Sequence, residues 1–521
     1  MKNKSNLLLL FIFIGGLLFS LLFWNERLAL NLFIYSIFIL AVNFWNPEIP
    51  KSPKFITYAV AHLFAAILVV INNSDLTLVA YYFSLLIFIG FGHFQQLRTV
   101  FLAIITAGIQ IITVPIGLVQ RLSQVSIGGF NLKPALKLIK YIIFPVFIVA
   151  VFTGIYSGAN QIFSHYTNNF FTGIEVFFTQ ISNFLFKDLS LPRFMHFCLG
   201  FILSAGLTIT FFSKALEDME GKCREQLLRL RRNIKSKTLW YEIVHTFGAN
   251  LITKNLALKT EYIIAVISFT ALNLLILFLN LIDITTLWFN YIPTGSFSAD
   301  LHQGTNALIF SIMIAMAVIV YFFRANLNFY SKSHLLRILA YTWMIQNFIL
   351  IISVFIKDGY YIDVYGLTHK RIGVLVFAIL CIIGLITVYI KVAKQKTFFY
   401  LLKVNGSIWF ILLLTFSTIN WDVFIVKYNF AHKDSITFDP DYQLSLSDKT
   451  LPTLDKNRKS LTLSIINNLP EYEIPKPSSN DELQGRLDTR IEYFKERYNE
   501  GNWVSWNLPD WNAAQYFGLS K

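Results

Sequence analysis

Long apolar segments follow one another through the first 420 positions, separated by short polar stretches. A run of about 17–25 apolar residues has the length that an α-helix needs to cross about 30 Å of hydrocarbon. The pattern therefore predicts an all-α, polytopic transmembrane helix bundle of about twelve spans. The predicted spans are Leu7–Phe23, Leu28–Phe44, Phe55–Ile71, Leu76–Phe91, Thr99–Val119, Leu138–Tyr156, Phe194–Phe212, Tyr262–Ile282, Ala307–Phe323, Ile338–Ile356, Ile372–Ile390 and Val404–Ile419.

One aromatic stretch, residues 161–190, departs from this pattern. Asn168, Asn169, Glu175 and Lys187 interrupt its apolar positions. A helix of this composition is typical of the headgroup layer, so we expect it to lie in the membrane interface. A second interpretation stays open, because a crossing here, or one re-entrant segment among the first five, would bring the basic loops onto one side.

The last hundred residues, 420–521, are polar and predict a small soluble helical tail. Ser479 and Glu482 form a capping box, and Gly501 stands where a helix C-cap is expected. The positions between them form an apolar stripe at helical spacing: Leu483, Leu487, Ile491, Phe494 and Tyr498. We expect this stripe to pack on Trp503, Trp506, Trp511 and Phe517. Further helix starts are predicted at Asp439-Pro440 and at Ser447.

Charge divides the chain in the same way. The net charge is +14, but the tail from Trp421 onward carries 12 Lys/Arg against 15 Asp/Glu. Elsewhere the basic residues gather in Lys214–Lys259, Arg324–Arg337 and Lys391–Lys403, with 10, 3 and 4 Lys/Arg respectively. Basic loops stay in the cytoplasm, so the tail is expected outside it, on a multi-pass protein of the cytoplasmic membrane.

Four regions follow from these patterns: N-terminal transmembrane helices in 1–213, a basic connector in 214–259, C-terminal transmembrane helices in 260–419 and the tail in 420–521. Basic loops between spans meet anionic headgroups, so the lipid bilayer is the expected partner and nucleic acid is not. The connector fits a helix on an anionic leaflet and a solvated link equally well. The tail could take a protein partner, and the sequence leaves the oligomeric state open.

The stretch "DGYYIDVYGLTHKR" between two spans raises a physical question. Gly366 permits a tight turn and Thr368 can cap the next helix, which places Lys370 and Arg371 in that helix's first turn. Cations are disfavoured there, because the N-terminus is the positive end of the helix dipole. Two hypotheses account for them: both side chains extend to lipid phosphates, or Arg371 is a fixed dock for an anion or for the acidic tail.

Four short elements carry a resemblance to a known family. They are "YGLTHKR" with Tyr365, Gly366, Leu367, Thr368 and Arg371, "YN" at Tyr428 and Asn429, "DPDYQLSLSDKTLP" with Tyr442, Asp448 and Pro452, and "WVSWN" with Trp503, Trp506 and Asn507. In this order they resemble the motifs of a bacterial membrane-protein family, domain of unknown function 4173, to which 4153 is related. The resemblance implies an architecture, and it assigns these positions no role.

Residues that carry chemistry are few. No catalytic, cofactor-binding or metal-binding pattern stands out, and the three cysteines have no metal-site or disulfide spacing. Asn273 and Asn280 lie seven positions apart on one helix face, which favours interhelical hydrogen bonds over a polar path. We therefore expect a non-enzymatic membrane protein with a sensor, scaffold or assembly role. The alternative is a transporter or flippase-like carrier, which would need a polar cavity lined by Gln346, Asn347 and Asn405.

Overall fold

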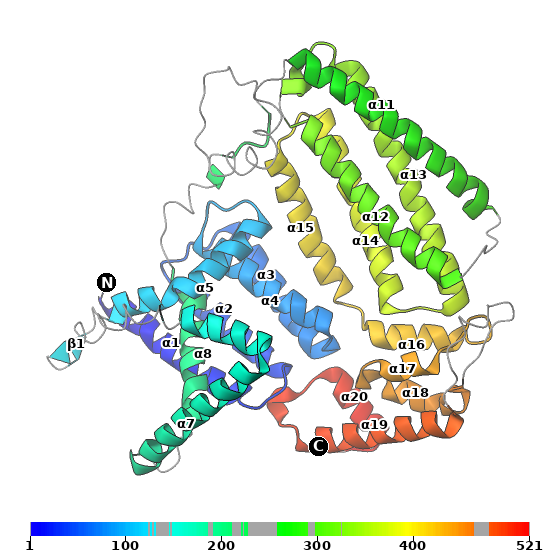
Figure 1. The fold of residues 1–521 in the computed structure, drawn as a ribbon. Coiled ribbons are helices and arrows are strands. Elements are labelled where there is room, and N and C mark those ends of the chain that lie inside the picture. The colour runs from blue at the N-terminus through cyan, green and yellow to red at the C-terminus, as the bar shows by residue number, and fades with distance from the viewer. Residues whose placement is uncertain are drawn as a thin grey trace. The chain divides into compact units, whose positions relative to one another are not determined.

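The structure is a computed structural model, and it describes residues 2–122, 126–127, 130–131, 145, 148–185, 191–210, 220–221, 223–227, 258–289, 297–324, 326–462 and 479–519. Apart from one antiparallel pair of two-residue strands, β1 (Ser126–Ile127) and β2 (Phe130–Asn131), the elements in these ranges are helices (Figure 1). The chain forms two compact units, which are described separately. Most of the basic connector predicted in 214–259 lies outside the described residues.

The first unit joins the N-terminal helices to a short piece of the tail, Gly501–Asn507. Its helices are α1 (Lys2–Phe23), α2 (Leu30–Trp45), α3 (Pro53–Asn72), α4 (Asp75–His93), most of α5 (Val100–Leu122), an apolar helix Ile148–Ala159, α7 (Gln161–Leu185) and α8 (Leu191–Thr208). Helix α1 packs closely on α8, where a Cβ at Gly200 would come within 2.6 Å of the Phe19 side chain. Small residues allow such close approach of two apolar helices.

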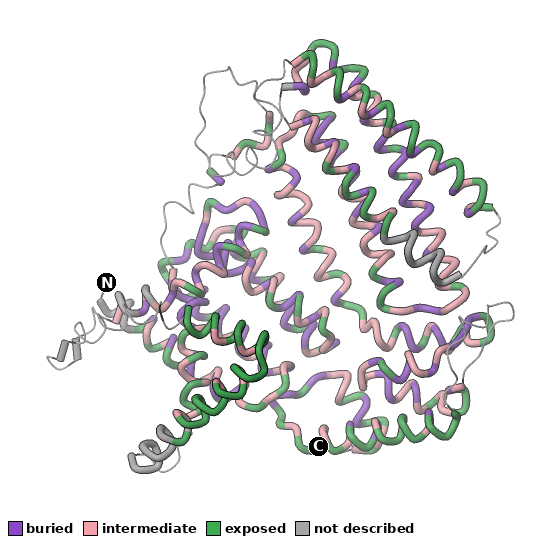
Figure 2. The backbone as a smooth tube through the Cα atoms, viewed as in Figure 1, coloured by how far each residue is buried: buried purple, intermediate pink, exposed green. Residues whose placement is uncertain are grey.

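The predicted interfacial stretch, 161–190, forms one helix as far as Leu185, and residues 186–190 lie outside the described part. Most of its described side chains are exposed, including Ile162, Tyr166 and Phe170 (Figure 2). Its position relative to a membrane stays a prediction.

Among the described residues of the second unit, five long helices precede the tail. They are α11 (Leu258–Asp283, continued by a π-helical turn Ile284–Trp288), α12 (Phe297–Phe322), α13 (Ser333–Tyr365), α14 (His369–Ala393) and α15 (Phe398–Phe416). Helix α13 packs on α11, α12 and α14, and α15 packs on α14. The shared core includes Phe269, Ile319 and Leu350, all fully buried.

Helices α11 and α13 run parallel and are tied by amide side chains. Asn273 Nδ2 donates to the carbonyl of Leu339 at 3.0 Å, and Asn280 Nδ2 donates to the carbonyl of Gln346 at 3.0 Å. Gln346 Nε2 in turn donates to Asn273 Oδ1 at 2.7 Å. The seven-residue spacing of the two asparagines thus serves interhelical hydrogen bonding, as the sequence predicts.

The tail is helical, and its predicted boundaries agree well with the structure. Its helices are α16 (Trp421–Ala431), α17 (Pro440–Ser445), α18 (Leu451–Lys456), α19 (Asn480–Glu500) and α20 (Leu508–Tyr516). Asp439 caps α17 through a bond from Tyr442 N, Ser479 Oγ accepts from Glu482 N, and α19 ends directly before Gly501. Ser447 precedes a 3₁₀ turn, Asp448–Thr450.

The partner of the α19 stripe differs from the prediction. Leu483, Leu487, Ile491 and Phe494 are buried in a core with α17, α18 and α20, and Phe517 packs at its edge. Trp503 and Trp511 are instead exposed by 69% and 39%. Ala513 and Ala514 take the place in that core that was expected for the tryptophans, and both are fully buried.

Seven helices in the described residues are long and apolar enough to cross a membrane: Pro53–Asn72, Asp75–His93, Leu191–Thr208, Leu258–Trp288, Ser333–Tyr365, His369–Ala393 and Phe398–Phe416. Five shorter apolar helices overlap the other predicted spans: Leu7–Phe23, Leu30–Trp45, Val100–Pro115, Ile148–Ala159 and Ala307–Phe322. The chain is therefore an all-helical protein of the multi-pass membrane type, and the count of about twelve spans stays a prediction.

Candidate functional site

The connection between α13 and α14 is much shorter than the apolar pattern indicates. The predicted span ends at Ile356, but α13 continues to Tyr365, so that the link consists of Gly366, Leu367 and Thr368 alone. Gly366 has a φ of +75° and a ψ of −169°, a conformation that is essentially restricted to glycine. We call Gly366–Thr368, with the helix ends that it joins, the corner.

Thr368 caps α14 as predicted, and Lys370 is exposed in its first turn. Arg371, in contrast, is only 8% exposed, so it does not extend to lipid phosphates. Its Nη1 atom donates to the carbonyl of Tyr365 at 2.9 Å and also to the carbonyl of Gly366. The guanidinium carbon lies 4.2 Å from the centre of the Tyr361 ring.

These contacts explain why a buried cation is stable at the start of a helix. The carbonyls of Tyr365 and Gly366 belong to the C-terminus of α13, which is the negative end of that helix. Arg371 therefore satisfies two carbonyls that lack a partner within their own helix, and it also interacts electrostatically with Asp358. The Tyr361 ring packs against this cation on one side.

The tail is fixed to the corner by one asparagine. Asn429 Nδ2 donates to the carbonyl of Leu367 at 2.9 Å, and Asn429 Oδ1 accepts from the amide of Leu367 at 2.6 Å. Two further bonds support it: Thr437 N donates to the carbonyl of Val364 at 2.7 Å, and Tyr442 Oη accepts from His369 N at 3.1 Å. A side chain at position 366 has no room, since its Cβ would lie 2.6 Å from Asn429 Oδ1.

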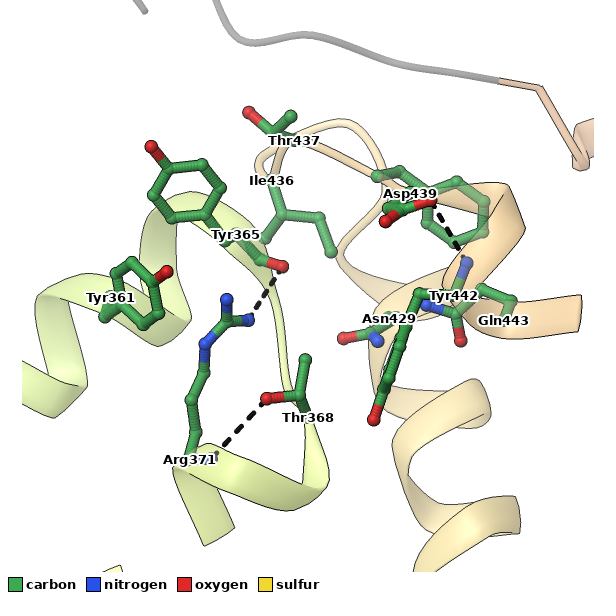
Figure 3. A pocket seen from close by; sticks show the side chains of 11 residues that line it. Tyr361, Tyr365, Thr368, Arg371, Asn429, Ile436, Thr437, Asp439, Tyr442 and Gln443 are labelled. Carbon is green, nitrogen blue, oxygen red and sulfur yellow. Dashed lines mark hydrogen bonds between the residues drawn. The ribbon is translucent and has the colours of Figure 1, made fainter. Parts of the chain in front are cut away.

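Between the corner and the tail lies a cavity of about 200 Å³. Its walls are Tyr361, Tyr365, Thr368 and Arg371 from the corner, and Asn429, Ile436, Thr437, Phe438, Asp439, Tyr442 and Gln443 from the tail (Figure 3). The Arg371 side chain and the Asp439 carboxylate stand on opposite sides of this view. Five of the motif positions thus meet around one cavity: Tyr365, Thr368, Arg371, Asn429 and Tyr442.

An acidic residue next to the cavity joins three segments. Asp422 Oδ1 lies 2.6 Å from His369 Nε2, and Asp422 Oδ2 accepts a hydrogen bond from Ser447. Burial disfavours the charged form of Asp422, but the hydrogen bonds with His369 and Ser447 outweigh it and lower the pKa of its carboxyl group. The sequence identifies Ser447 only as a helix start and does not predict the cluster, because Asp422 lies 53 positions from His369 and 25 from Ser447 without any local pattern.

Other motif positions hold the tail together. Asp448 forms ion pairs with Arg490 at 2.7 Å and with Arg497 at 2.6 Å, which fixes α19 to the 3₁₀ turn. Pro452 lies in the first turn of α18. The ring of Tyr428 stacks on His432, with 4.2 Å between the ring centroids.

The closing motif lies in the first unit. Ser505 Oγ accepts from Arg27 N at 3.0 Å and donates to Glu26 Oε2 at 2.6 Å, and the carbonyl of Trp506 accepts from Leu30 N at 3.2 Å. Trp503 is exposed and Asn507 is buried. The segment therefore covers the turn between α1 and α2.

The residues proposed for a polar transport path form hydrogen bonds within and between helices. Gln346 bonds to Asn273, Asn347 Nδ2 donates to the carbonyl of Trp343 at 2.8 Å, and Asn405 Oδ1 accepts from Thr387 at 3.0 Å. In the described part of the chain, no group of three or more His, Cys, Asp or Glu side chains is placed to hold a metal ion.

The arrangement defines a class of protein: a multi-helix membrane protein whose polar C-terminal module is docked on one corner of the bundle. The chain belongs to the family Domain of unknown function (DUF4153), which matches residues 56–457. This is the relative of the family expected from the motifs, and membership in family 4173 itself stays a prediction. The matched region includes the corner, Asn429 and Tyr442, and it ends before the Trp503 motif. No curated protein and no solved structure matches the chain.

Proposed function

We propose that the protein is a non-enzymatic sensor of the cytoplasmic membrane. In this proposal the tail lies outside the cytoplasm and passes its state to the transmembrane bundle through the corner. The observation that carries the proposal is the Asn429 clamp, in which one tail side chain satisfies both the amide and the carbonyl of Leu367.

Packing supports the same coupling. Leu367 and Ile372 of the corner are buried in one apolar core with Ile425, Ile436 and Phe438 of the tail. Close-packed interiors transmit displacements, because their side chains have few voids to move into. A change in the tail should therefore displace the first turn of α14.

Helix α14 could carry that displacement across the membrane. Lys391, near its other end, is 1% exposed, and its Nζ donates to the carbonyl of Phe323 at 2.7 Å. The helix is thus fixed at both ends by buried cations that bond to carbonyls at the C-terminal ends of other helices. A rigid helix held at two ends is suited to relay a small rotation or shift.

Hydrogen–deuterium exchange of the full-length protein in nanodiscs tests this coupling. Asn429→Ala should raise exchange in the corner and also in the distant turn between α14 and α15, because both ends of α14 lose constraint. The matched control is Asn457→Ala, which removes a bond to the Thr453 carbonyl inside the tail and should change tail peptides alone. If Asn429→Ala, like the control variant, changes hydrogen exchange in tail peptides alone, the sensor proposal is wrong.

A further inference from the structure

Helix α5 starts and finishes at the same end of the first unit, to which Leu97 and Arg121 both belong. Shortly before the helix, the carbonyl of Leu97 accepts a hydrogen bond from Lys54 Nζ at 3.1 Å. In its last turn, Arg121 forms an ion pair with Glu48 at 2.6 Å. Glu48 lies between α2 and α3, and Lys54 lies in the first turn of α3. A helix that crossed the unit would have its two ends at opposite turns, so α5 does not run as its apolar length indicates.

The packing partners of α5 lie at that same end. Ala103 packs against Gly90, in the last turn of α4, where a Cβ would collide with it. Gln110 Nε2 donates to the carbonyl of Gly206 at 2.8 Å, in the last turn of α8. Farther along α5, a buried cluster joins the first half of α1 to the ends of α2 and α8: Leu8, Ile12, Val42, Val114, Leu118, Ala205 and Ile209. These contacts place α5 across one end of the helix bundle.

The opposite end of the unit carries the turns from α1 to α2 and from α3 to α4. Asn73 Nδ2, at the end of α3, donates to the carbonyl of Leu28 at 2.9 Å and so joins the two turns. Ser505 of the tail bonds to the first of them. Because the tail is expected outside the cytoplasm, α5 lies at the cytoplasmic end. Charge agrees with this, since Lys51 and Lys54 stand at the α5 end.

The face that α5 turns away from the unit is apolar. Ile105 and Ile112 are exposed by 53% and 66%, whereas Thr106 and Gln110 are fully buried. A helix that faces water shows the reverse, with polar side chains outside. An apolar outer face at the end of a membrane-embedded bundle is suited to the acyl chains of the adjacent leaflet.

We propose that α5 does not cross the membrane but lies in the cytoplasmic leaflet, where the face of Ile105 and Ile112 binds lipid acyl chains. Of the twelve predicted spans, Thr99–Val119 then drops out and eleven are left. An odd number places the N-terminus inside and the tail outside. It also brings the basic stretch Arg121–Lys140 to the same side as Lys214–Lys259, which the positive-inside bias requires. This inference is independent of the sensor proposal.

Cysteine labelling distinguishes a helix in one leaflet from a span. In a full-length variant without native cysteines, Gln96→Cys, exposed before α5, and Gln124→Cys, after it, should react with an impermeant maleimide only once the cytoplasmic membrane is opened. The control is Asp75→Cys, exposed at the opposite end, which should react on intact cells after permeabilisation of any outer membrane. If Gln96→Cys and Gln124→Cys react from opposite sides, α5 crosses and the proposal is overturned. If both react on intact cells, the assignment to the cytoplasmic leaflet is overturned.

Fluorescence quenching in nanodiscs tests the contact with lipid. A bimane label on Ile105→Cys and on Ile112→Cys should be quenched by brominated acyl chains, at similar depths, and not by aqueous iodide. A crossing helix would separate these positions by about 10 Å in depth, since a helix rises about 1.5 Å per residue. The control label on Glu492→Cys, exposed in the tail, should be quenched by iodide alone. A depth difference near that of a crossing helix, or labels that brominated chains do not reach because a second protein chain covers them, would overturn the proposal.

Discussion

Two cations on α14, Arg371 and Lys391, show how this protein buries charge. A buried cation is expensive unless its donors are satisfied, and a nearby carboxylate is the usual solution. Here the hydrogen bonds go instead to the carbonyls of Tyr365, Gly366 and Phe323. The C-terminal ends of helices provide both acceptors and negative potential, so each cation also completes the hydrogen bonding of another helix.

Gly366 is the residue whose replacement should cost most at the corner. Its backbone conformation costs a residue with a side chain about 1–3 kcal/mol, and a Cβ would also collide with Asn429 Oδ1 at 2.6 Å. We expect Gly366→Ala to lower the melting temperature of the purified protein markedly. The control is Gly359→Ala, inside α13, where a Cβ meets nothing within 4 Å and should stabilise the helix by about 0.5–1 kcal/mol. Equal melting temperatures for the two variants would contradict the role given to Gly366.

The Asp422 cluster should make the tail dock acid-sensitive. The hydrogen bonds from His369 and Ser447 lower the pKa of Asp422 below its unfolded value of about 3.9. A lowered folded-state pKa adds stability that is fully present above the unfolded pKa and is lost as the pH falls through the folded pKa. The stability difference between wild type and Asp422→Asn should therefore be present at about pH 5 and shrink as the pH falls below about 4.

Thermal unfolding at a series of pH values measures this difference. Asp434→Asn serves as the control, because Asp434 is exposed and should give a small difference throughout. A difference between wild type and Asp422→Asn that grows as the pH falls below about 4 would show that the cluster does not favour the ionised carboxylate.

At the scale of helices, the sequence predicts where elements lie better than what they contact. Apolar length locates the seven helices that are long enough to cross a membrane, but it misses the last nine residues of α13, Lys357–Tyr365. Hydropathy changes where polar side chains begin, whereas the helix ends only at Gly366, where the backbone conformation changes. The tail helices are predicted by their caps and their period, because both are local features.

Contacts between distant segments leave no such local pattern. The Asn429 clamp joins positions 62 apart, and the cavity combines residues from the corner and the tail. The motif resemblance marks several of these residues without giving their geometry. The predicted packing of the α19 stripe is right for Phe517 but wrong for the tryptophans Trp503 and Trp511, because Ala513 and Ala514 allow the closer approach.

The α19 stripe gives a sharp test of the tail core. Ile491→Asp places a carboxylate at a position that is 6% exposed, and the lost apolar burial alone is worth about 1.5–3 kcal/mol. We expect hydrogen exchange across 480–500 to rise strongly in this variant. Tyr493→Asp, two positions along the same helix and 63% exposed, should leave exchange almost unchanged. Similar exchange in both variants would show that α19 does not pack through this stripe.

On the scale of the whole molecule, polar features of the second unit gather at its two ends. Arg324 pairs with Glu261 at 3.6 Å, so the start of α11 and the end of α12 share one end. The turn after α14 joins the connector at that end through a bridge between Gln226 and Lys396. The corner follows the C-terminal end of α13, and the tail follows the C-terminal end of α15. Both of these ends lie opposite to the end that Arg324 and Glu261 share. The described residues of all three basic stretches therefore fall at the end of the helices away from the corner.

This grouping makes a single sidedness prediction possible. Basic loops are retained in the cytoplasm, so the common end of the three stretches should be cytoplasmic and the tail should lie outside. In a variant without Cys198, Cys223 and Cys381, Glu492→Cys in the exposed face of α19 should react with an impermeant maleimide on intact cells, after permeabilisation of any outer membrane. Lys332→Cys, exposed before α13, should react only once the cytoplasmic membrane is opened. The reverse labelling pattern would place the tail inside the cell, because one inversion moves every loop of the unit together.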